Sequence, residues 1–138
     1  MAISLGLRVG ALVLTFGVLL GSVVVGIASA QTPQIAPEAE KARKNPLASD
    51  SKAIEQGEKV AKTNGVSCQG AKSKGDGAAA AALNPKPADW TSQKVQVESD
   101  GEIFWKISNG RGAMPPWKHL AENDRWALVR YLRSVGGK

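Results

Sequence analysis

The sequence predicts a small all-α domain with long ordered loops, preceded by a leader. Apolar side chains recur at helical spacing in three separate stretches, and capping residues bound these stretches. No stretch shows a convincing length of the apolar–polar alternation that is typical of a half-buried strand. With 138 residues, the chain has room for one domain and its appendages, which excludes a multidomain enzyme.

Residues 1–30 are typical of an export signal. They contain one charged residue, Arg8, then an apolar run, and end in Ala-Ser-Ala at 28–30, the pattern that a signal peptidase accepts. The alternative is an uncleaved anchor, because the run over 9–28 nearly reaches the roughly 20 apolar residues that span a bilayer. Either way we expect a periplasmic or otherwise exported domain, tethered to the inner membrane only if the segment is retained.

Residues 31–50 are expected to be a flexible linker, because they hold three prolines and almost no large apolar side chains. The whole chain has 18 Lys and Arg against 12 Asp and Glu, a net charge of +6. These cations are scattered rather than gathered with stacking aromatics, so nucleic acid is not expected as a partner. They indicate a solvated surface or, alternatively, steering toward an acidic protein or an anionic membrane face.

The first helix of the domain, which we expect over 51–138, is predicted from a cap at Asp50 or Ser51 to about Asn64. Gly57 lies in its middle, where glycine costs about 1 kcal/mol relative to alanine. It therefore indicates either the close approach of another helix or an unfavourable surface position.

The segment 65–91 has few helix signals beyond a turn at 78–82, because glycine and proline interrupt it. The second helix is predicted from Ser99, which forms a capping-box pattern with Glu102, to Asn109 before a glycine.

The third helix is predicted from about Glu122 to Val135, with acidic residues near its start and arginines near its end, as the helix dipole favours. Its expected buried face consists of Trp126, Leu128, Val129, Tyr131, Leu132 and Val135. Ordering about thirty loop residues costs roughly 1–2 kcal/mol each, whereas burying a large side chain returns about 1.5–3 kcal/mol. Since 51–138 holds only 20 large apolar residues, we expect a large apolar cofactor between the helices.

Two stretches are more specific. One reads Thr-Asn-Gly-Val-Ser-Cys-Gln-Gly at 63–70, and the other reads Asn-Gly-Arg-Gly-Ala-Met-Pro-Pro-Trp at 109–117. Together with the last helix and a pairing of Gly57 with Tyr131, they resemble a class I cytochrome c over 51–138. The resemblance implies the cytochrome c fold, with three main helices and long loops around a haem-type pocket, and single-electron transfer as the activity.

The resemblance also implies a haem c cofactor, attached by a Cys-x-x-Cys-His segment whose His is one axial ligand, with a Met from the later loop as the other. Met114 stands where that Met belongs. Gly65 stands in place of the first Cys and Gln69 in place of the His, so that only Cys68 remains in the motif. We therefore expect haem c to be absent, or at most singly linked through Cys68. The alternative roles are a free thiol for Cys68 and a core gap-filler for Met114.

His119 is the only histidine and is expected to be exposed before the third helix. A copper site of Cys68, Met114 and His119 is not expected, because blue-copper sites use two histidines. Trp90, Trp105 and Trp117 would help to wall a cofactor pocket.

Two functions remain open. The first is an exported electron carrier with a degenerate haem site, which would serve a redox protein partner or a larger membrane-associated complex. The second is a haem-free relative that acts as an interaction or structural subunit of a larger periplasmic complex. An enzyme is not expected, since the sequence has no P-loop, no zinc-ligand cluster and no histidine at the spacing of a known triad.

Overall fold

The computed structural model describes residues 35–138. The export signal expected at 1–30 and the first residues of the expected linker lie outside this part. The elements are α1 (Glu38–Lys41), α2 (Lys52–Asn64), α3 (Val66–Gln69), the short 3₁₀ helix η1 (Ala80–Ala82), α4 (Gln93–Gln96), α5 (Asp100–Asn109) and α6 (Glu122–Val135). Within this range no strand forms, which confirms the all-α prediction. No helix among these residues has the length and apolar character needed to cross a membrane.

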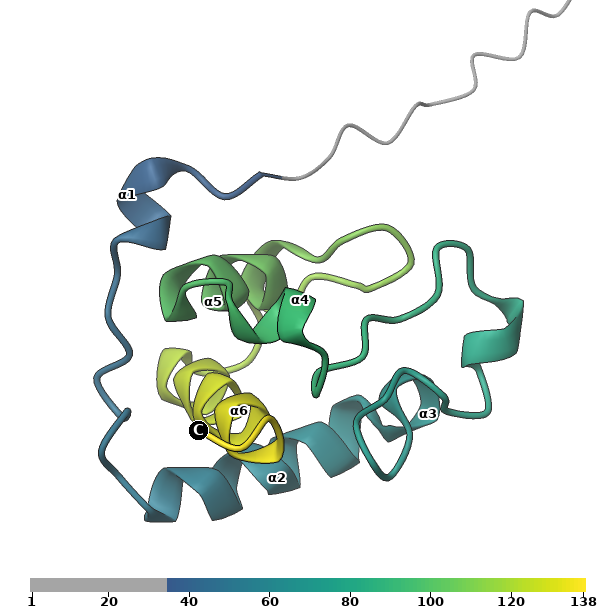
Figure 1. The fold of residues 1–138 in the computed structure, drawn as a ribbon, viewed down its shortest axis with the longest axis horizontal. Helices are drawn as coiled ribbons and strands as arrows, with labels where there is room; N and C mark the ends of the chain where they lie inside the picture. The colour runs from purple at the N-terminus through teal and green to yellow at the C-terminus, as the bar shows by residue number, and fades with distance from the viewer. Residues whose placement is uncertain (1–34) are drawn as a thin grey trace, which may run out of the picture. The chain divides into compact units, whose positions relative to one another are not determined.

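Helices α2 and α6 cross in direct contact (Figure 1). The crossing passes through Gly57, where an added Cβ atom would clash with the backbone carbonyl of Ala127 and lie 2.7 Å from Cβ of Tyr131. The glycine is therefore required by the close approach of the two helices, one of the two interpretations that the sequence left open.

The core lies between α2, α5 and α6. The Phe104 ring of α5 stacks on the Trp126 ring of α6, with centroids 3.8 Å apart and planes at 15°. Of the residues expected on the buried face of α6, Tyr131 and Val135 are half-buried and the rest are buried. Helix α5 begins as predicted, because the Ser99 side chain accepts a hydrogen bond from the backbone N–H of Glu102.

The segment expected to be a flexible linker is packed against the domain from Ile35 onward. Ala36 is 1% exposed, and the buried side chain of Asn45 donates to the carbonyl of Trp126 at 3.1 Å. Helix α1 packs against α5, where Gly101 leaves room for the backbone of Glu40. Residues 35–50 are therefore an arm of the domain, held by tertiary contacts that composition does not reveal.

Helices α3 and α4 were not predicted, because each is only four residues long and lacks a strong local signal. Tertiary hydrogen bonds hold α4: the Gln96 side chain donates to the carbonyls of Trp90 at 2.7 Å and Leu132 at 3.1 Å. Helix α3 follows α2 immediately, and the chain then continues into the loops of residues 70–92 (Figure 1).

Candidate functional site

The attachment segment of the sequence forms the end of α2 and the single turn of α3. Gly65 joins the two helices, and its backbone N–H donates to the carbonyl of Ala61 at 2.8 Å. A Cβ atom at Gly65 would lie 3.1 Å from that carbonyl oxygen and 3.4 Å from Cη2 of Trp117. Trp117 is 5% exposed, and its indole is in ordinary van der Waals range of Gly65, the position where the resemblance expects the first cysteine.

Gln69 lies at the end of α3, and both polar atoms of its amide have protein partners. In the orientation that satisfies both, the nitrogen donates to the carbonyl of Ala88 at 3.0 Å and the oxygen accepts from Nε1 of Trp90 at 3.3 Å. Trp90 is only 5% exposed, so this amide oxygen is the acceptor for the indole N–H of a buried core residue. The amide therefore joins α3 to the loop at 88–90.

That loop is itself fixed by Asp89. The carboxylate accepts hydrogen bonds from Oγ1 of Thr91 at 2.7 Å and from its backbone N–H at 2.8 Å. These bonds lower the pKa of Asp89 below the ordinary value of an aspartate. A backbone hydrogen bond from Trp90 to the carbonyl of Ser73, at 2.9 Å, ties the loop to the segment after α3.

Cys68 is a free, half-buried thiol. Its sulfur lies 3.8 Å from Oγ of Ser67. The backbone carbonyl of Cys68 accepts a hydrogen bond from the N–H of Gly77 at 3.0 Å, so the following loop closes the turn that carries the thiol. The part of the chain that the structure describes contains no cluster of three His, Cys, Asp or Glu side chains able to hold a metal ion.

Met114 lies in the loop between α5 and α6, half-buried against the apolar core. Two backbone hydrogen bonds of 3.0 Å pair it with Arg111 and close the loop. Gly110 adopts φ +75°, a conformation that favours glycine, where a Cβ atom would lie 2.9 Å from Pro115. His119, five residues after Met114, is exposed as expected.

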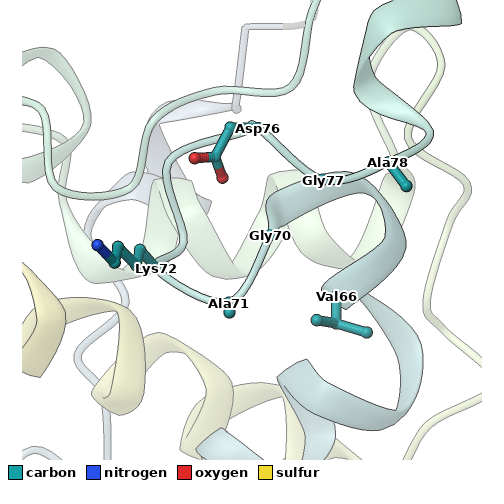
Figure 2. A pocket seen from close by; sticks show the side chains of 7 residues that line it. All are labelled: Val66, Gly70, Ala71, Lys72, Asp76, Gly77 and Ala78. Carbon is teal, nitrogen blue, oxygen red and sulfur yellow. The ribbon is translucent and has the colours of Figure 1, made fainter.

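Of the tryptophans expected to wall a pocket, Trp90 and Trp117 belong to the buried core and Trp105 is half-buried. A pocket of about 440 Å³ lies beside α3, lined by the exposed side chain of Val66, by Lys72 and Asp76, and by glycines and alanines of the 70–78 loop (Figure 2). It is open to solvent, and neither Cys68 nor Met114 lines it.

The residues present do not fit a haem c held by two thioethers and by His/Met ligation. One thiol cannot form two thioethers, and a glycine, Gly65, stands at the position expected for the other cysteine. An amide is a poor iron ligand beside the imidazole, thiolate and thioether of haem proteins, and the amide oxygen of Gln69 is engaged by Trp90. The part that Ala88 and Trp90 play has no signal in the sequence, because it depends on the loop returning to α3.

Comparisons with known proteins place this architecture in a family. The family model described as cytochrome C oxidase, cbb3-type, subunit III, matches residues 52–132. No curated protein sequence matches the chain. Among solved structures, the chain is similar to part of the Kuenenia stuttgartiensis reducing HAO-like protein complex, with 27% identity and a TM-score of 0.55. That similarity covers 62% of this chain and 44% of the other, less than half of its length. The chain belongs to the cytochrome c family represented by subunit III of cbb3-type oxidases.

Proposed function

We propose that this cytochrome c-family domain is a haem-free interaction or structural subunit of a larger exported complex. The observation that carries the proposal is the state of Gln69, at the position where the family has its axial histidine. Its amide is held by the carbonyl of Ala88 and the indole of Trp90. A metal ligand needs a lone pair directed at the metal, and here the amide oxygen accepts from an indole N–H instead.

The names of the matching family and of the similar structure support a partner protein. The matching family is named for a subunit of an oxidase, and the similar solved structure is named as a protein complex. We propose the same setting for this chain, with residues 1–30 as its export signal or membrane anchor and with the folded domain at 51–138 extended by the arm at 35–50.

A second candidate function is a single-electron carrier. Family membership favours it, as do Cys68 and Met114, two of the family's functional positions that this chain keeps. It requires that a haem be held through one thioether and without the axial histidine.

An absorbance spectrum distinguishes the two functions. The full chain is co-expressed with cytochrome maturation machinery, purified and reduced. We expect a cooperatively folded protein with no Soret band and no α-band. A stoichiometric haem spectrum from the wild-type protein would overturn the proposal in favour of the carrier.

The double variant Gly65→Cys and Gln69→His restores the family's attachment motif and serves as the positive control. We expect it to take up haem covalently, because the rest of the family pattern, including Met114, is in place. The matched negative control is Gly65→Cys alone, which supplies the second thiol and keeps Gln69 in place of the imidazole. A colourless double revertant would show that the loss extends beyond these two positions.

A further inference from the structure

We propose that Gln69, Trp90 and the carbonyl of Ala88 form an internal latch that takes over the structural role of the axial ligand, so that α3 is closed with no cofactor bound. The inference rests on the proposed function and extends it by naming the residues that make a haem-free fold self-sufficient. In the family, a ligand bond at this position ties the attachment turn to the centre of the domain. Here two hydrogen bonds of 3.0 and 3.3 Å tie the same position to the 88–90 loop.

The geometry matches the need of each partner. The indole of Trp90 has one donor, Nε1, and this residue of the buried core is 5% exposed, so the Gln69 oxygen is the acceptor that the fold offers to this N–H. Ala88 is exposed, so its carbonyl could turn to water instead. The Trp90 bond is therefore the costly one to lose, and the Ala88 bond serves mainly to orient the amide.

The segments that the latch joins share one further hydrogen bond, from the backbone N–H of Trp90 to the carbonyl of Ser73 at 2.9 Å. This bond brings the loop after α3 into contact with the loop before α4. A second bond, from the backbone N–H of Gly75 to the carbonyl of Gln69 at 2.9 Å, closes the loop after α3 on itself. The latch therefore closes a local unit of residues 66–77 and 86–90, separate from the crossing of α2 and α6 at Gly57.

A test of the latch uses hydrogen exchange on the colourless wild-type protein, measured by NMR. We expect the indole N–H of Trp90 to be protected. The indole N–H of half-buried Trp105 makes no hydrogen bond within residues 35–138, so we expect it to exchange quickly. In Gln69→Met, which keeps the side-chain length but loses both bonds, exchange of the Trp90 indole should accelerate about tenfold, equivalent to 1.4 kcal/mol. Amides of 66–77 should accelerate with it, and those of α2 and α6 should not.

The matched control is Gln56→Met. Gln56 also donates one hydrogen bond, to Asp124 at 2.9 Å, but on the surface. We expect this variant to leave the Trp90 indole unchanged. A Trp90 indole that exchanges as fast as that of Trp105, or a Gln69→Met protein that exchanges like Gln56→Met, would overturn the latch and leave the haem-free function standing. A coloured wild-type protein would instead overturn the proposed function.

A thermal melt of each variant distinguishes local opening of the latch from unfolding of the whole protein. If Gln69→Met does not fold, Trp90→Phe supplies the second measurement, because it removes the donor and keeps an aromatic ring in the core. We then expect the loop amides of 66–77 to lose protection in Trp90→Phe and to keep it in Trp105→Phe. Equal protection in these two variants would refute the latch.

Discussion

Arg43 joins the arm at 35–50 to the aromatic core. Its removal tests whether the contacts of this arm stabilise the domain. Its guanidinium carbon lies 4.7 Å from the ring centroid of Phe104 and 5.1 Å from that of Trp126. Its nitrogens pair with the carboxylates of Glu40 at 3.2 Å and Glu122 at 2.6 Å. Removing Arg43 therefore breaks contacts to α1, α5 and α6 together.

The size of the effect follows from the exposure of these groups. The Arg43 side chain is 37% exposed, so each ion pair is screened by water and contributes about 0–1 kcal/mol. A cation–π contact at such a site contributes about 0.5–1 kcal/mol. We expect Arg43→Ala to lower the free energy of unfolding by about 1–2 kcal/mol. Arg43→Lys keeps the charge but loses the flat stacking group, so its loss should be smaller.

The measurement is urea unfolding followed by far-UV circular dichroism. Lys44→Ala is the control, because Lys44 is the exposed neighbour of Arg43 and has no ion pair within residues 35–138. We expect the control to change the free energy of unfolding by less than about 0.5 kcal/mol. If Arg43→Ala and Lys44→Ala unfold at the same urea concentration, the contacts of Arg43 do not contribute to the stability of the domain and the reasoning fails.

Two further predictions concern the helix crossing and the acid side of the stability curve. Gly57→Ala should destabilise the protein by about 3 kcal/mol, because the new Cβ atom would clash with the backbone of Ala127, which cannot move aside. The control, Lys59→Ala on the same helix, should be near neutral. A thermal melt compares the two variants, and equal melting temperatures would refute the close crossing. The hydrogen bond from Arg43 lowers the pKa of Glu122 below 4.5, so its stabilising contribution is complete above that pH and is lost as the pH falls through the lowered folded value. Glu122→Gln should therefore flatten the fall in melting temperature as the pH drops below the ordinary pKa of a glutamate, and an unchanged profile would contradict this.

The main helices were predictable because their signals are local. The cap at Ser99 and the charges along 122–135 specify α5 and α6 from neighbours a few residues away. The arm was not predictable, because its three prolines and few large apolar groups are also those of a linker. What orders it is the surface offered by Phe104 and Trp126, far along the chain.

The site divides in the same way. The resemblance to a class I cytochrome c pointed to Gly65, Cys68, Gln69 and Met114, since the expected attachment motif is contiguous and its loop partner has characteristic flanking residues. The resemblance also implies which groups of the motif are missing here. It carried no information on what occupies their place, because the partners of Gln69 lie about twenty residues downstream in a loop without a regular pattern.

The sequence by itself determined the main helices and the family pattern, since each is written in residues that are adjacent or regularly spaced. Only the tertiary structure decided that residues 35–50 pack on the core, that Trp117 contacts Gly65, and that Trp90 engages Gln69. The physical reason is that a buried indole needs an acceptor and an apolar face needs a cover, and any nearby segment can supply either. Which segment does so depends on how the loops close in three dimensions.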